Sequence, residues 1–301
     1  MGSPEFAVPT LEALVKHYVV TGVVTQPDRP AGRGRKLTPP PVKSLAIELE
    51  IPLIQPGRLS DPDAMSMLLA WKPDLIVVTA FGQILRREVL DLPGYGCINV
   101  HASLLPRWRG AAPIQAAILH GDQRSGVTIM KMDEGLDTGP IISQKELVLA
   151  KFETAGSLSP KLSQLGAQLL VDTLPGYLDG SLQPVPQHGP STYAPMLKKK
   201  DGELDFNQSA EAIERKIRAY HPWPGTFMVW SDQRLKIHQA RVEQGTASPN
   251  LKAGDHLILE DHPAMMTSEG MIIFEVLQPP GKKPMPGPAF LLGARHWVRD
   301  G

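Results

Sequence analysis

Short apolar runs alternate with longer amphipathic segments over the first 178 residues. The short runs are rich in β-branched residues and predict strands, whereas apolar residues spaced three and four apart predict helices. Strands are predicted over residues 19–25, 75–79, 97–100 and 127–132, and helices over 42–50, 61–71, 111–120 and 155–178. This alternation is typical of an α/β fold in which helices cover a parallel sheet.

The pattern changes after residue 178. Residues 180–195 are rich in proline and lack periodicity, which predicts an extended linker. A short helix capped by Asn207 or Ser209 follows, and then short apolar runs alternate with turn residues. We therefore expect a Rossmann-like parallel-sheet domain over residues 1–179, a linker over 180–198 and a small OB-like β-barrel over 199–301.

Length and composition narrow the class of protein. A chain of 301 residues is long for one core and comfortable for two domains. Its 31 basic and 31 acidic residues give no net attraction to polyanions, so any contact with nucleic acid must be local. The single cysteine suits a reducing compartment, and no apolar run approaches the roughly 20 residues of a membrane span. We expect a cytosolic protein.

The stretch CINVHASLLPRWRGAAPIQ, residues 97–115, holds the main candidate for a reaction centre. Asn99 and His101 are two residues apart at the end of a predicted strand, so their side chains leave the same face of the sheet. Open α/β sheets bind ligands at this end of their strands. An amide beside an imidazole can present two N–H groups to a developing oxyanion, although a histidine at this position can equally be structural.

Asp137 lies between glycines in the loop EGLDTG, residues 134–139, beyond another predicted strand. Aspartate is common in such turns without any catalytic role. If the fold brings Asp137 to His101, its carboxylate can keep the imidazole protonated or relay a proton. The nine histidines form no spaced cluster with carboxylates, so we expect no metal.

These residues and their surroundings resemble the formyltransferase family that uses 10-formyltetrahydrofolate, in particular its branch that acts on methionyl-tRNA. Asn99, His101, the following SLLP turn and Asp137 carry the resemblance at the candidate centre. The stretches QPDRPAGRGRKLTPPPVK (26–43), GVTIMKMDEGLDTG (126–139) and RAYHPWPG (218–225) extend it over nearly the full chain. The resemblance implies a formyltransferase domain followed by a tRNA-binding barrel.

The resemblance also implies the reaction. A formyl group would pass from 10-formyltetrahydrofolate to the α-amine of methionine on initiator tRNA, for translation initiation. Asn99 and protonated His101 would stabilise the oxygen of the tetrahedral intermediate, while Asp137 would keep His101 charged and help to move a proton. No covalent nucleophile is implied, and Cys97 is expected in the core. We expect a cytoplasmic monomer that binds tRNA and the folate donor and no membrane.

Two further groups of residues are implied as binding residues. The folate would contact the SLLP turn and a loop that follows a predicted strand, although the loop can equally serve ordinary packing; these residues are Ser103, Leu104, Leu105, Pro106, Phe81, Gly82, Gln83, Ile84 and Leu85. The tRNA acceptor end would contact a basic segment that can also be a solvated loop; its cations are Arg29, Arg33, Arg35, Lys36 and Lys43.

The opening stretch MGSPEFAVPTLEAL raises a separate question. Its Gly-Ser-Pro turn leads into a predicted helix, yet no strand precedes the turn. A vector-derived scar is one explanation. The resemblance favours another, because in the family such a turn follows the first strand of the sheet. We therefore expect that the first strand is missing through a start codon assigned too late, which would leave strand edges unpaired.

Two other functions remain open at the level of sequence. A related enzyme could formylate a small amine, such as glycinamide ribonucleotide or an amino sugar nucleotide. Alternatively, a chain without its first strand could bind RNA with impaired catalysis. The basic segment and the second domain favour a macromolecular substrate.

Overall fold

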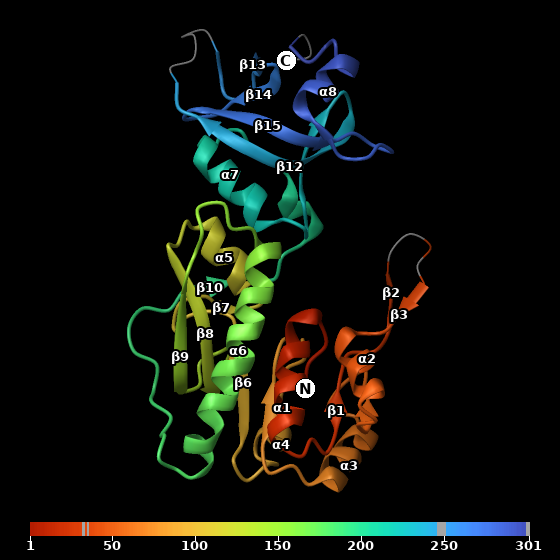
Figure 1. Cartoon of the computed structure of the whole chain (residues 1–301), viewed down its shortest axis with the longest axis vertical. Coiled ribbons are helices and arrows are strands. Elements are labelled where there is room, and N and C mark those ends of the chain that lie inside the picture. The colour runs from red at the N-terminus through yellow and green to blue at the C-terminus, as the bar shows by residue number, and fades with distance from the viewer. Residues whose placement is uncertain (32–33, 35, 246–250, 299–301) are drawn as a thin grey trace. The chain divides into compact units, whose positions relative to one another are not determined.

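The computed structural model describes residues 1–31, 34, 36–245 and 251–298, which form two compact units (Figure 1). Unit 1 contains Met1–Pro113, Arg124–Val148 and Ser159–Ala194. Unit 2 contains Ile114–Gln123, Leu149–Leu158 and, apart from the positions outside the described residues, Pro195–Gly301. Each unit has its own sheet and its own buried apolar cluster.

Two sheets form the centre of unit 1. One pairs β1 (Val23–Val24) with β4 (Leu53–Ile54), and the other, which is mixed, contains β5 (Ile76–Val78), β6 (Cys97–His101), β8 (Arg124–Lys131) and β9 (Ile141–Val148). The pairs β1–β4 and β5–β6 are parallel, as the sequence pattern predicts, whereas β8 runs antiparallel to both β6 and β9. Antiparallel strands at the edge of an otherwise parallel sheet are common in large sheets.

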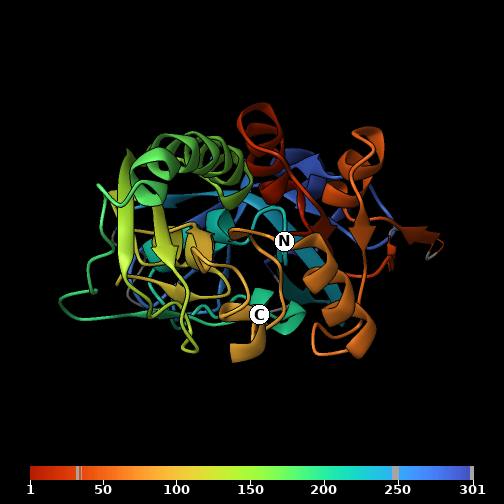
Figure 2. The same ribbon diagram turned by 90° about the horizontal axis from the view of Figure 1, so that it is seen from below.

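The 3.6-residue spacing predicts most of the helices in the first half of the fold, although not α4 (Arg87–Leu90). The others are α1 (Val8–His17), which follows the short helix η1 (Glu5–Ala7), α2 (Pro41–Glu48), α3 (Pro62–Trp71), α5 (Pro113–Leu119) and α6 (Ala155–Leu178). Most of α5 and the first four residues of α6 belong to unit 2. Helix α6 runs along the sheet in both views (Figures 1 and 2). Gly166 allows this close approach, because a Cβ there would lie 2.7 Å from the Val100 side chain.

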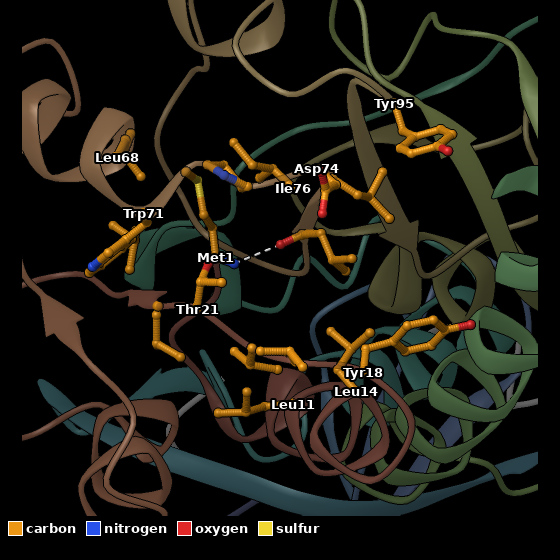
Figure 3. A pocket seen from close by; sticks show the side chains of 18 of the residues that line it. Met1, Leu11, Leu14, Tyr18, Thr21, Leu68, Trp71, Asp74, Ile76 and Tyr95 are labelled. Carbon is orange, nitrogen blue, oxygen red and sulfur yellow. Dashed lines mark hydrogen bonds between the residues drawn. The ribbon is translucent and has the colours of Figure 1, made fainter.

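Strands β1 and β5 are not paired with each other, and a gap lies between them. Met1 and Gly2 bridge one end of it: Gly2 donates to Val24, while the Met1 amine donates to the Val77 carbonyl. Beyond them lies a cavity of about 540 Å³ lined largely by apolar residues (Figure 3). The prediction of a preceding strand stays a prediction.

Two small strand pairs complete unit 1. Strands β2 (Arg29–Ala31) and β3 (Lys36–Thr38) form an antiparallel hairpin within the predicted basic segment. Strands β7 (Arg109–Gly110) and β10 (Tyr193–Ala194) pair in parallel. The second pair joins the proline-rich segment to the segment that follows the SLLP turn.

Unit 2 is built on an antiparallel sheet, which agrees with the β-rich pattern of the sequence. Strands β11 (Thr226–Trp230), β12 (Gln233–Glu243), β15 (Met271–Gln278), β14 (His262–Met266) and β13 (His256–Leu259) are paired in that order, and β16 (Met285–Pro286) pairs with β15. Helices α7 (Ala210–Ala219) and α8 (Gly287–Gly293) and the short helix η2 (Lys199–Gly202) accompany the sheet. Ser209 caps α7 by accepting from the amide of Ala212, and Trp297 is buried in the core. Among the described residues the strand pairs do not close into a complete barrel.

Candidate active site

Asn99 and His101 are presented from one face of β6, as their spacing predicts. His101 is buried, with 5 % of its surface exposed, and Asn99 is half-buried. The Nε2 atom of His101 lies 3.0 Å from the carbonyl oxygen of Trp108. A carbonyl oxygen can only accept, so Nε2 carries a hydrogen and donates it. This contact orients the ring and leaves Nδ1 directed toward Asp137.

The loop that follows β8 brings Asp137 to these two side chains. Asp137 accepts a hydrogen bond from the Asn99 amide at 3.3 Å and from the backbone N–H of Gly110 at 2.8 Å. Its Oδ2 atom is 3.6 Å from His101 Nδ1, which is too long for a hydrogen bond and close enough for charge attraction. The three residues predicted as the catalytic group therefore lie together, although Asn99 and Asp137 are 38 positions apart.

Local chemistry shapes the loop around Asp137. Asp133 accepts from the amide of Gly135 and from the Thr138 hydroxyl, which closes the loop on itself. Gly139 is required by close packing, because a Cβ there would lie 1.9 Å from the Lys131 carbonyl oxygen. Asp137 itself has a φ of 53°, in the left-handed region that few residues other than glycine, asparagine and aspartate adopt.

The arrangement offers two N–H groups beside one carboxylate. The Asn99 amide has a second hydrogen besides the one it directs at Asp137, and His101 can carry a hydrogen on Nδ1 when it is protonated. An oxygen placed near both would accept from each. The carboxylate next to them can accept a proton from a reacting amine. This set of groups suits acyl transfer to an amine.

The SLLP turn is held by polar side chains of the neighbouring strands β8 and β9, of which Thr128 is buried and Gln144 is exposed. Thr128 accepts from the amide of Leu105 and donates to the carbonyl of Ser103, while Gln144 donates to the carbonyl of Leu105. The Ser103 hydroxyl donates to the carbonyl of Arg107, and the carbonyl of Pro106 accepts from Thr192 at 3.4 Å. Leu104 is half-buried. The polar groups of the turn are thus largely engaged within the protein.

The loop of residues 81–85 divides into a buried and an exposed part. Phe81 and Leu85 belong to the apolar core of unit 1. Gln83 accepts from the amide of Leu59 and donates to the carbonyl of Pro56, so it holds another loop in place. Ile84 is 84 % exposed and Gly82 is exposed with a φ of 79°. Of these five residues, Gly82 and Ile84 are the ones accessible to a ligand.

The basic residues also divide in the structure. Arg29 and Lys36 are exposed on the hairpin, with the Arg29 guanidinium donating to the side chain of Gln26. Lys43 is instead paired with Asp28 at 2.8 Å. The hydrogen bonds from Lys43 and from Gln55 lower the pKa of the Asp28 carboxyl below its usual value. The remaining two predicted residues, Arg33 and Arg35, lie outside the described residues.

Four residues that hydrogen-bond to Asp137 or to the SLLP turn were not identified from the sequence: Thr128, Gln144, Gly110 and Gln187. Thr128 and Gln144 lie within strands β8 and β9, where a polar residue gives no sign in the sequence of a role at the site. Gly110 contributes a backbone N–H, which has no sequence signal. Gln187 lies in the proline-rich segment, whose composition predicts only a linker. Their roles depend on contacts between segments far apart in the chain.

Cys97 is an inert part of the core. Burial raises the pKa of its thiol to about 12, so it is not a nucleophile at neutral pH. The described residues contain no group of three or more His, Cys, Asp or Glu side chains able to hold a metal ion. None of the described helices combines the length and apolar character needed to cross a membrane.

Comparisons with known proteins match both units. The family model described as "Formyl transferase" matches residues 2–174, and "Formyl transferase, C-terminal domain" matches residues 196–295. The methionyl-tRNA formyltransferase of Myxococcus xanthus is 47% identical over 296 residues, covering 97% of this chain and 93% of the relative. That of Thermodesulfovibrio yellowstonii is 44% identical over 297 residues, covering 98% and 94%.

Solved structures show the same fold at lower identity. The N-formyltransferase of Helicobacter canadensis, solved with folinic acid and dTDP-3-aminofucose, has a TM-score of 0.66 at 19% identity and covers 91% of this chain and 96% of that one. The methionyl-tRNA formyltransferase of Clostridium thermocellum has a TM-score of 0.50 at 22% identity and covers 68% and 88%.

Proposed function

The chain belongs to the formyl transferase family, and we propose that it transfers the formyl group of 10-formyltetrahydrofolate to the α-amine of methionine on initiator tRNA. The observation that carries this proposal is the meeting of Asn99, His101 and Asp137 in a chain whose relatives of the same length are methionyl-tRNA formyltransferases. The product is the formylated initiator tRNA used to begin translation, which takes place in the cytoplasm.

The proposed reaction is direct acyl transfer. The methionyl amine attacks the formyl carbon, and the carbonyl oxygen takes up negative charge in a tetrahedral intermediate. Asn99 Nδ2 and protonated His101 Nδ1 donate to this oxygen, which lowers the barrier most where the charge develops. Asp137 holds the imidazolium and accepts the proton that leaves the amine. The C–N bond to folate then breaks, and the proton passes to the departing nitrogen.

Binding of the donor and of the tRNA is assigned to different surfaces. Leu104, Gly82 and Ile84 are the proposed folate contacts because they are not committed to the core. The buried Phe81, Leu85 and Leu105 shape the site from beneath, with Ser103, Pro106 and Gln83 holding its backbone. The hairpin cations contact the tRNA acceptor end. In this proposal residues 1–179 are the formyltransferase domain, 180–198 connect it, and 199–301 support the tRNA as part of a monomer.

The alternative of a small amine substrate is less well supported. Its solved representative with dTDP-3-aminofucose is 19% identical and shares the fold alone. The relatives at 44–47% identity cover nearly the whole of both chains, including the second unit. The alternative of impaired catalysis is opposed by the three candidate catalytic residues, which lie within reach of one another.

Purified protein mixed with methionylated initiator tRNA and 10-formyltetrahydrofolate tests the proposal. We expect formyl-methionyl-tRNA, identified by mass spectrometry after ester hydrolysis, and product formation slowed by about a hundredfold or more when Asp137→Asn replaces the wild type. A parallel reaction with an amino sugar nucleotide addresses the alternative. Formylation of the sugar with no formylation of the tRNA would reject the proposal.

A further inference from the structure

The proline-rich segment, residues 180–195, forms hydrogen bonds to the segments that hold the candidate active site, and we call it the strap. Val185 exchanges two backbone hydrogen bonds with Ile141, both 2.8 Å long, at the start of β9. Thr192 accepts from the amides of Trp108, through its hydroxyl, and of Arg109, through its carbonyl. The segment therefore holds both the strand that follows the Asp137 loop and the segment that orients His101.

Gln187 is the strap residue that reaches the Asp137 loop. Its Nε2 donates to the backbone carbonyls of Asp137 and Gly139, each at 2.8 Å. Its Oε1 accepts from the Arg109 guanidinium, at 3.1 Å from Nε and 2.7 Å from Nη2. Gln187 thus links the Asp137 loop to Arg109. The residue after Arg109, Gly110, donates its amide hydrogen to the Asp137 carboxylate, so the two linked segments also meet at that carboxylate.

The placement of the Asp137 carboxylate depends on the backbone of its loop. Its contacts to Asn99 and His101 are long, at 3.3 and 3.6 Å, and its short hydrogen bond, at 2.8 Å, comes from the backbone amide of Gly110, the residue after Arg109. Its φ of 53° lies in the left-handed region, which aspartate adopts more readily than most residues but which remains less populated than the extended and helical regions. Gln187 satisfies the carbonyl of this residue and of Gly139, and so holds the loop in that conformation.

We propose that Gln187 is a positioning residue for formyl transfer, which acts by holding Asp137 in register with His101 and Asn99. The inference rests on the proposed function for its kinetic consequences. It assigns to the connecting segment a part in the active site of unit 1. Misplacement of a catalytic group by about 1 Å can cost about a hundredfold in rate, so a single clamp of this kind has a measurable effect.

Three variants separate positioning from general support. Gln187→Ala removes every contact of the side chain. Gln187→Glu has nearly the same size and still accepts from Arg109, but its carboxylate cannot donate to the two carbonyls. Gln183→Ala is the matched control, because Gln183 lies in the same segment and donates only to the carbonyl of Gly180 among the contacts described.

We expect Gln187→Ala and Gln187→Glu to lower kcat by about tenfold to a hundredfold, with KM for both substrates within about threefold of wild type. Gln187→Glu should melt close to wild type, since it keeps its partner Arg109, while Gln183→Ala should match wild type in every measurement. Wild-type turnover in Gln187→Glu, or a loss in Gln183→Ala as large as in Gln187→Ala, would overturn the proposal.

A double-mutant cycle tests whether Gln187 acts through Asp137. In an Asp137→Asn background, Gln187→Ala should reduce the residual kcat by less than about twofold, because the group it positions is already disabled. The full loss in that background would contradict the inference. Hydrogen exchange gives a readout without catalysis: Gln187→Ala should accelerate exchange across residues 133–140 and Gln183→Ala should not. Unchanged exchange would overturn the inference, whereas a wild type inactive on methionyl-tRNA would overturn only the proposed function.

Discussion

His101 is oriented by a neighbour whose own backbone is strained. Trp108 has a φ of 60°, which is unfavourable for a bulky side chain, and it directs its carbonyl at His101 Nε2. The amide of Trp108 donates to Thr192, which anchors this conformation. Backbone strain of this kind tends to persist at functional sites, where surrounding contacts enforce it. The imidazole is thereby held with Nδ1 facing the Asp137 carboxylate.

We predict that His101→Ala and Asn99→Ala each lower kcat while tRNA binding persists. Each removes one donor to the developing oxyanion, which typically costs about a hundredfold to a thousandfold in rate. Single-turnover formylation and equilibrium tRNA binding measure the two effects separately. His17→Ala, at the exposed end of α1, is the control. Near-normal turnover in both site variants would reject this assignment.

The hairpin of β2 and β3 and the gap between β1 and β5 each lead to a prediction. The hairpin of β2 and β3 presents Arg29 and Lys36 to solvent, whereas Lys43 at its base is neutralised by Asp28. Strands β1 and β5 are not paired with each other, and residues of both line the cavity beside Met1. The first element concerns the binding of tRNA, and the second concerns stability.

A salt titration of tRNA binding tests whether the basic segment, residues 29–43, contacts tRNA phosphates. Arg29→Ala and Arg33→Ala should each weaken binding and reduce the log-log salt slope by about 0.9 for a duplex contact, because each loses one phosphate contact. Arg33→Glu should be worse, since it adds repulsion. Lys43→Ala should leave the slope unchanged because its charge is already paired. Superimposable curves for wild type, Arg33→Ala and Arg33→Glu would make the hairpin a solvated surface feature.

The second prediction concerns the gap beside Met1. Alternate residues of the flanking strands direct their backbone groups into it: Val23 and Thr25 donate to the β4 side, so Val24 faces the gap and accepts from Gly2. Five β-branched residues added before Met1 should pair with both edges, fill the apolar cavity and raise the melting temperature. A Gly-Ser addition of equal length is the control. Equal melting of the two extended proteins would show that the gap accepts no strand.

The stabilising effect of the β-branched residues added before Met1 should be larger at low pH. Burial lowers the pKa of the Met1 amine from 8.0 to about 6. Between pH 8 and pH 6 the unfolded chain therefore binds more protons at this amine than the folded chain, and folding stability falls as the pH falls. The loss is at most about 2–3 kcal/mol. An added strand replaces the amine by a peptide N–H, so its stabilising effect should be larger at pH 6 than at pH 8 in denaturant titrations.

Charge is balanced over the whole molecule, with 31 basic and 31 acidic residues. A general electrostatic field therefore cannot concentrate tRNA, and recognition has to come from local contacts. Unit 1 supplies the candidate reaction centre and the exposed hairpin, and unit 2 supplies a separate β-rich body matched by the C-terminal domain of the family. Contacts far from the reacting amine can then contribute to catalysis.

We predict a large difference between methionyl-tRNA and methionine methyl ester as acceptors. Both present the same amine, but only the tRNA offers remote binding energy, so its kcat/KM should be at least about a thousandfold higher. Added salt should narrow the ratio, because phosphate contacts weaken with ionic strength. Initial rates at two salt concentrations measure it. Equal kcat/KM for both acceptors would favour a small-amine enzyme.

Local sequence patterns predicted most of the long helices and the strand that carries Asn99 and His101, but not β4, α4 or β9. The 3.6-residue spacing located α6 at residues 155–178, and the alternation around residues 97–101 put Asn99 and His101 on one face. These features depend on backbone periodicity, which neighbouring residues encode. The glycine-flanked loop made Asp137 a candidate, and the resemblance implied its role and the reaction, which periodicity alone leaves open.

Only the tertiary structure decided which distant groups meet. It made β8 antiparallel to β6, brought Asp137 to Asn99 across 38 positions, and paired Lys43 with Asp28. It also turned the proline-rich segment into a strap whose Gln187 reaches Asp137 across 50 positions. Composition predicted a linker there because proline and glycine reveal the absence of regular structure and say nothing about contacts. Such contacts arise when elements pack and buried polar groups must find partners, which no local pattern specifies.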